Sequence, residues 1–121
     1  MPVRRSVFNI LTDTGAGYTD TGAPVNGLVL GAYLKLNDTG QLDTGANVTI
    51  TAVGSERQLA KWDNVGAASR AINSRQAVHD TGGAVIDGQY EYFMLADESL
   101  RVNVEQGGVA KSATLYVWHG W

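Results

Sequence analysis

Cysteine is absent from the 121-residue chain. Without a thiol, the protein can form no disulfide, use no cysteine nucleophile and build no zinc–thiolate site. Histidine is scarce as well, with His79 and His119 as the two copies. His79-Asp80 could serve as an acid/base or metal-binding pair, but one such pair in a turn is more often structural. We therefore assign no metal site and no cofactor.

Charge and long apolar runs are also limited. Charged residues make up 17% of the chain, the net charge is −3 at pH 7, and Arg4-Arg5 is the only adjacent basic pair. A nucleic-acid partner would require a basic stripe, which the sequence does not contain. No apolar run approaches the ~20 residues of a membrane-spanning helix. The apolar stretch near the N-terminus is interrupted at Asn9, which argues against a signal peptide. We expect neither a nucleic acid nor a membrane as partner.

Proline occurs only twice, whereas glycine occurs fifteen times. The glycines separate short apolar runs, with turn signals about every ten residues, and this spacing is typical of all-β sandwiches and barrels. A chain of this length holds one core. The sequence predicts an all-β fold, an antiparallel β-sandwich of jelly-roll-like type, forming a single domain over residues 10–121. Residues 1–9 are a possible N-terminal arm, and the alternative is an ordinary edge strand.

Alternation of apolar and polar residues predicts several strands. The positions expected to face the core are Val48, Ile50, Ala52, Leu100, Val102, Val104, Ala113, Leu115 and Val117. Gly107-Gly108 separates the last two runs, which predicts that they form a hairpin. Further strands are expected at 5–11, 26–36, 57–62 and 89–95. The segment 64–78 is expected to be a loop with at most one helical turn, because Gly and Asn weaken a helix.

Asp-Thr-Gly occurs five times, at 13–15, 20–22, 38–40, 43–45 and 80–82. An Asp side chain accepts a hydrogen bond from backbone two residues on, and Gly supplies a positive φ, so the triplets are expected to be strand-ending turns. Four of the carboxylates could alternatively gather around a calcium ion: Asp13, Asp20, Asp38 and Asp43. Their spacing matches no known calcium loop, which favours solvated turns.

One triplet also spells an enzyme signature. Leu42–Ala46 reads like the catalytic loop of the retroviral-type aspartic proteases, in which two subunits each contribute an Asp and the pair shares a proton. Asp43 would then be catalytic in a dimer. That family also has a glycine-rich flap and a Gly-Arg segment that braces the loop, yet no arginine after residue 46 follows a glycine. The turn interpretation is preferred, so we assign no catalytic residue and keep the protease as the less favoured alternative.

The two ends of the chain suggest a binding surface. Tryptophans at a chain end are typical of docking against a partner. The candidate interface residues are Arg4, Arg5, Phe8, Trp118 and Trp121. A glycan-binding module is another hypothesis, and it would use the aromatic residues Tyr90, Tyr92, Phe93, Trp118 and Trp121.

Several segments together resemble a family of small virion proteins of tailed bacteriophages. The matching segments are 26–30, Leu42–Ala46 running into 48–51, the turn at 75–80, the Tyr-rich 90–93, 100–108 and 111–117. The Trp118–Trp121 tail departs from the pattern. The resemblance implies a sandwich or jelly-roll protein without catalysis that decorates (cements) the capsid by binding the major capsid protein. It also implies a location on the capsid surface of the virion, after assembly in the host cytoplasm. A neck, tail or head-fibre component is the alternative.

A cement protein stabilises the shell because its binding free energy exists only in the assembled lattice. Many copies around symmetry axes would add modest contacts through avidity. We therefore expect a homo-oligomer, a trimer rather than a dimer.

Overall fold

The computed structural model describes residues 3–36, 39–65, 69–72, 76–79 and 81–120. These residues contain nine strands, and none of them lies in a helix. The predicted all-β class is therefore confirmed. The strands are β1 (Val3–Leu11), β2 (Tyr18–Leu36), β3 (Asn47–Ala52), β4 (Arg57–Trp62), β5 (Arg70–Ile72), β6 (Gln76–His79), β7 (Val85–Glu91), β8 (Phe93–Glu105) and β9 (Ser112–Gly120). No helix that could span a membrane is found in this part of the chain.

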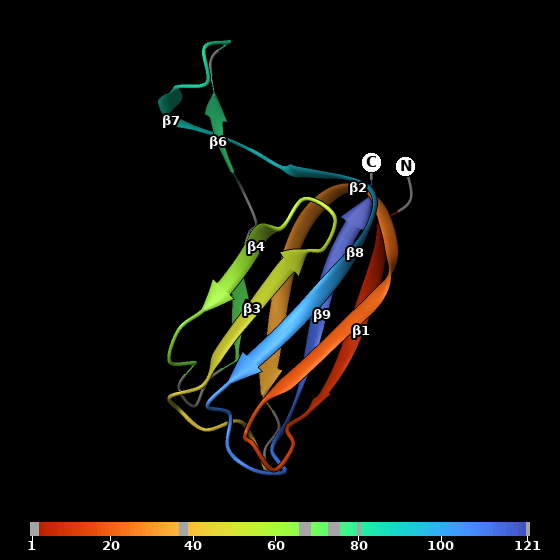
Figure 1. Ribbon diagram of the computed structural model, residues 1–121, viewed down its shortest axis with the longest axis vertical. Helices are drawn as coiled ribbons and strands as arrows, with labels where there is room; N and C mark the ends of the chain where they lie inside the picture. The colour runs from red at the N-terminus through yellow and green to blue at the C-terminus, as the bar shows by residue number, and fades with distance from the viewer. Residues whose placement is uncertain (1–2, 37–38, 66–68, 73–75, 80, 121) are drawn as a thin grey trace.

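Seven strands form one sheet in the order β1-β9-β2-β8-β3-β4, with β5 also paired to β2. All of these pairs are antiparallel. The long strand β2 changes partner along its length. Its first half pairs with β8 from Tyr18 to Val29, and its second half pairs with β9 from Leu28 to Leu36. The sheet therefore doubles over at β2, so that β1 and β9 lie behind β8 and β3 (Figure 1). Jelly-roll connectivity stays a prediction.

The core lies between the two halves of this folded sheet. All nine positions predicted to face inward are buried, from Val48 in β3 to Val117 in β9. Their sequence neighbours Arg101 and Glu105 are exposed. The period of two thus identified the buried face correctly, because successive side chains of a strand point to opposite sides of the sheet.

The predicted hairpin between the last two long strands is wrong. β8 pairs with β2 and β3, whereas β9 pairs with β1 and β2. The loop at 106–111 instead carries the chain from one half of the folded sheet to the other. Alternation shows which side of a strand is buried and carries no information about its partner, so two successive strands across Gly107-Gly108 looked like a hairpin.

The strands expected at 5–11 and 57–62 are confirmed as β1 and β4, and the run at 26–36 lies within β2. The run at 89–95 is divided between β7 and β8. The segment 64–78, expected to be a loop with at most one helical turn, contains β5 and the start of β6, while 66–68 and 73–75 lie outside the described residues. β5 forms because Ala32–Leu34 offers it a free side of β2.

Two ends of the body differ in shape. At one end, the loops 12–17, 40–46 and 106–111 come together; we call this the loop end. At the other end lie both chain termini and a separate two-stranded sheet, in which β6 pairs with β7 (Figure 1). This β6–β7 hairpin stands off the seven-stranded body.

Candidate functional site

Asp43, the residue of the protease signature, lies at the loop end in a tight turn. The Ala46 N–H donates to the Asp43 carbonyl at 2.9 Å, which closes a β-turn. The Asp43 N–H donates to the Gly107 carbonyl at 3.0 Å, so the turn is fixed to the 106–111 loop. This geometry agrees with the expected turn.

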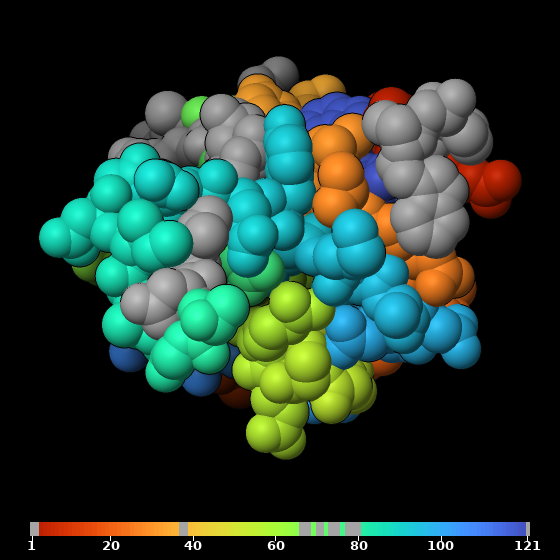
Figure 2. Space-filling view, turned by 90° about the horizontal axis from the view of Figure 1, so that it is seen from above, coloured from red at the N-terminus to blue at the C-terminus, as the bar shows by residue number. Residues whose placement is uncertain are grey.

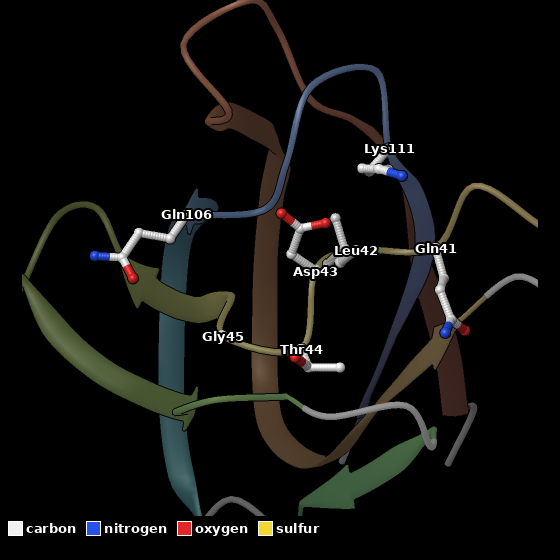
Figure 3. Close-up of a pocket in the computed structure, with 7 residues that line it drawn as sticks. All are labelled: Gln41, Leu42, Asp43, Thr44, Gly45, Gln106 and Lys111. Atoms are coloured by element: carbon white, nitrogen blue, oxygen red, sulfur yellow. The ribbon is translucent and has the colours of Figure 1, made fainter.

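The Asp43 carboxylate is exposed and points toward the 106–111 loop (Figure 3). Gly108 makes this possible: a Cβ there would come within 2.6 Å of the Asp43 Oδ1, and its φ is +82°. An open depression of about 570 Å³ surrounds the carboxylate. Its lining residues are Gln41, Leu42, Asp43, Thr44, Gly45, Gln106 and Lys111. Asp43 is the one carboxylate of this lining, so proton sharing of the protease type would require the Asp43 of a second copy.

A buried threonine connects the loops beneath this depression. Thr12 is 4% exposed. Its Oγ1 donates to the Gly108 carbonyl at 2.5 Å and accepts from the Lys111 N–H at 2.8 Å. Its backbone N–H donates to the Lys111 carbonyl at 2.9 Å. Segments almost a hundred residues apart in sequence are therefore held by one side chain.

The other Asp-Thr-Gly triplets are not equivalent. The Asp13 Oδ1 accepts from the Gly15 and Gly17 N–H groups at 2.8 and 3.2 Å, which is the predicted turn chemistry. The triplet at 20–22 lies inside β2, so the strand-ending prediction is wrong there. A positive φ, expected at the glycine, is found at Gly40 but not at Gly15, Gly22 or Gly45. Asp38 and Asp80 lie outside the described residues.

Asp20, inside β2, accepts a hydrogen bond from another residue of the same strand. The Tyr18 hydroxyl donates to the Asp20 Oδ2 at 3.0 Å. Burial, together with this carboxylate, raises the pKa of Tyr18 to about 12. No group of three acidic or imidazole side chains that could hold a metal occurs among the residues that the structure describes. Asp13, Asp20 and Asp43 are therefore not gathered around a common site.

The predicted interface residues have different positions. Phe8 is 4% exposed and packs against Gly22 of β2, so it belongs to the core and the proposed surface role is wrong. In the sequence, the alternation of Val7 and Phe8 along the strand was the sign that Phe8 points inward. Arg4 and Arg5 are exposed, Trp118 is half-buried, and Trp121 lies outside the described residues. Residues 1–9 were predicted to form an N-terminal arm or an edge strand. From Val3 on they belong to β1, which pairs with β9 along its whole length, as the edge-strand alternative states.

Arg5 and Trp118 lie on one surface, the outer face of β1 and β9. Arg5 and Trp118 are register partners, as are Val7 and Tyr116. The Arg5 guanidinium carbon lies 4.5 Å from the Tyr116 ring centre, and the Tyr116 and Trp118 rings are 6.0 Å apart. A cation over the ring stabilises this arrangement. Because Arg5 covers the Tyr116 ring, that ring is not a free platform for a sugar.

Val3, Val7 and Leu11 follow β1 on the same outer face, and all three are exposed, Leu11 at 63%. β1 is the end strand of the sheet order, paired only with β9. An exposed apolar edge strand is a surface on which another chain can add. Val3, Val7 and Leu11 were not among the predicted interface residues, which were charged or aromatic. Their i, i+4 spacing along an alternating strand was the available signal.

His119 lies on the opposite side of β9 from Trp118 and is buried. Its Nε2 is 3.0 Å from the Ser6 Oγ. Burial, and then the positive charge of Arg4, lower the pKa of His119. The lowered pKa favours the neutral imidazole.

A second exposed apolar group lies at the hairpin end. Its members are Val85, Tyr90, Tyr92 and Met94, and Tyr90 is 68% exposed. Phe93, in the same stretch, is buried. Of the aromatic residues considered for glycan binding, Phe93 therefore belongs to the core, and Tyr90 and Tyr92 lie away from the outer face.

Neither a protein-family model nor a curated protein sequence matches the chain. Among solved structures, the crystal structure of FLHE is similar over 100% of both chains, with a TM-score of 0.51 and 13% sequence identity. At this identity the likeness shows the fold alone. The path of the chain through the β-strands is thus one that another protein also adopts.

Proposed function

We propose that the protein is a bacteriophage capsid decoration (cement) protein that binds the major capsid protein and stabilises the head. The observation that carries the proposal is the outer face of β1 and β9. There, Val3, Val7 and Leu11 remain exposed on a strand that has one free edge. Exposed apolar side chains on a paired, ordered strand favour binding to a protein surface, because their burial releases water without ordering the chain.

The stretch from Val7 to Leu11 offers a short linear contact. At about 3.3 Å per residue, these two positions are about 13 Å apart along β1. Tyr116 and Trp118 lie on the same face, and aromatic residues are enriched in protein interfaces. A single contact of this size would be modest, and many copies on one lattice would add up to a stable coat.

Binding to emptied heads tests the proposal. Purified heads lacking the protein are mixed with the wild type or with Val7→Asp/Leu11→Asp, and bound protein is measured after sedimentation. We expect copies in proportion to the capsid subunits for the wild type and at least a tenfold loss for the variant, since two buried charges oppose docking. The matched control is Gln58→Asp, an exposed position on β4. Equal binding by the double variant and the control would refute the proposal.

The count of bound copies also separates the other virion roles. A neck, tail or head-fibre component would bind in a small number that is independent of the number of capsid subunits. Asp43→Asn addresses the protease alternative. A decoration protein should bind heads equally well with this change, whereas loss of a pepstatin-sensitive cleavage would favour the enzyme.

A further inference from the structure

The β6–β7 hairpin is exposed to a degree that requires explanation. An isolated two-stranded hairpin is marginally stable in water. Six of the seven β7 residues are exposed, and none is buried. Its apolar side chains Val85 and Tyr90 are uncovered, as is Met94 at the start of β8. Covering these apolar side chains with another protein surface would stabilise the hairpin.

The charge of the hairpin indicates what that surface is. The stretch 76–92 contains Asp80, Asp87 and Glu91 and no lysine or arginine. The Gln76 Nε2 donates to the Glu91 Oε1 at 3.2 Å, which restrains that carboxylate across the ribbon. The start of β1 has the opposite character. Arg5 is exposed on the outer face together with Val3, and Arg4 is exposed on the other side of the strand, next to His119. Val3–Leu11 contains no acidic residue.

We propose that the β6–β7 hairpin of one copy docks on the start of β1 of a second copy. In this contact, the hairpin lies along the free edge of β1. Tyr90 and Val85 cover Val3, and Asp87 and Glu91 face the arginines on the two sides of the strand, Arg5 and Arg4. The complementary charges fix the orientation, and the apolar side chains supply the buried area. Val7 and Leu11, farther along β1, are left for the capsid.

The positions of the two patches favour a head-to-tail assembly. Both lie at the same end of the body (Figure 1). Seen from above, the hairpin and the start of β1 lie on opposite sides of that end, with the hairpin on the left and the red atoms of β1 on the right (Figure 2). A hairpin therefore reaches a neighbour and not its own β1. A head-to-tail contact forms a ring where its rotation closes, and this closed form is the assembly that we propose.

The test uses the full-length protein alone, so its outcome is independent of capsid binding. Mass is measured by light scattering and native mass spectrometry over a dilution series. We expect a closed oligomer, a trimer, for the wild type and a monomer for Arg4→Glu/Arg5→Glu and for Asp87→Arg/Glu91→Arg. The chain with all four reversals restores both complementary charges and should reassemble. Lys35→Glu/Lys61→Glu is the matched control and should remain oligomeric. A monomeric wild type, or an oligomer that survives both reversals, would overturn the proposal.

The absence of cysteine allows a second, direct test. In Arg5→Cys/Tyr90→Cys, mild oxidation should join hairpin to β1 between chains and give a covalent ladder that ends at the closed ring. Each single variant can give at most a covalent dimer. If the double variant also stops at a dimer, the two patches do not meet and the proposed contact is wrong.

Discussion

The loop end and the hairpin end are built from the same kinds of residue, yet the chain fixes them in opposite ways. At the loop end, the backbone groups of three loops distant in sequence bond to one another, with buried Thr12 among them. At the hairpin end, β6 and β7 pair with each other in a separate sheet, and aromatic and aliphatic side chains are exposed to water. The loops of one end are joined within the chain, whereas the hairpin of the other end leaves its side chains exposed.

This difference between the two ends indicates which residues should affect binding and which should affect stability. Local stability within a fold ranges from near zero to the full free energy of unfolding, and binding segments come from the low end. The depression around Asp43 was the more conspicuous candidate from its sequence, but its loops are the better fixed of the two ends. Substitutions at the loop end should therefore change the global free energy of unfolding, and substitutions in the hairpin should change association.

The largest effect is expected from Gly108→Ala. The φ of +82° is strained for alanine, and its Cβ would lie 2.6 Å from the Asp43 Oδ1. We expect a loss of about 3 kcal/mol in the free energy of unfolding, measured by urea denaturation. The matched control is Gly88→Ala in β7, with a φ of +74° and open space around it. Its strain falls on the hairpin, so the global transition should hardly move. Equal losses in the two variants would remove the contrast between the ends.

Thr12→Val tests the connection between the loops. Valine keeps the shape but removes the hydroxyl, which leaves the Gly108 carbonyl and the Lys111 N–H without this partner. Unpaired buried polar groups cost about 2 kcal/mol of stability. Thr44→Val is the control, since Thr44 is exposed in the neighbouring turn, and its unfolding midpoint should stay at the wild-type value. A wild-type midpoint for Thr12→Val would show that water replaces the hydroxyl.

At the hairpin end of the body, the Glu98 carboxylate connects β8 to the turn between β3 and β4. Its Oε1 accepts from the Ser55 N–H at 2.6 Å, and its Oε2 lies 3.3 Å from the Arg57 guanidinium. Hydrogen bonds from Ser55, and then the Arg57 charge, lower the pKa of Glu98. A lowered pKa means that the carboxylate stabilises the fold above its unfolded pKa and that this stabilisation is lost as pH falls through the folded value.

Glu98→Gln should therefore lower the free energy of unfolding by about 1 kcal/mol at pH 7, a value reduced by solvent access. The difference from the wild type should shrink toward acid pH, because protonation removes the same charge from the wild type. Urea denaturation between neutral pH and pH 3 measures both. A difference that is constant with pH would assign the loss to shape and not to charge. Glu105→Gln, at an exposed position of the same strand, is the control.

The sequence predicted the strands better than their partners. Alternation identified the buried side of β3, β8 and β9 residue by residue, because the side-chain period is a local property. It could not predict that β2 changes partner near Leu28, since register shifts between Val25 and Gly27 and between Val29 and Gly31 depend on neighbouring strands.

The same limit applies to the turns. Asp-Thr-Gly-Ala occurs at 13–16, 20–23 and 43–46. The first and last copies close turns in which the alanine N–H donates to the Asp carbonyl, at 3.0 and 2.9 Å. The middle copy is part of β2 and pairs with β8. Identical local sequence thus gives a turn where the chain must reverse and a strand where a partner strand is present. The candidate surfaces were missed for a similar reason, because exposure of Val3, Val7 and Leu11 depends on what covers β1.

The smallest change in stability is expected from removing the hairpin altogether. Gln76 and Glu91 are register partners, so an Asn-Gly turn can replace residues 77–90 without moving the chain on either side. Because the described hairpin pairs with no strand of the body, we expect the free energy of unfolding of dilute protein to stay within about 0.5 kcal/mol of the wild type. The concentration dependence should differ: the Tm of the wild type should rise with protein concentration through self-association, and that of the shortened chain should not. A large loss in the free energy of unfolding of dilute protein would instead show that the hairpin is part of the cooperative folding unit. The two ends would then differ in exposure but contribute similarly to stability.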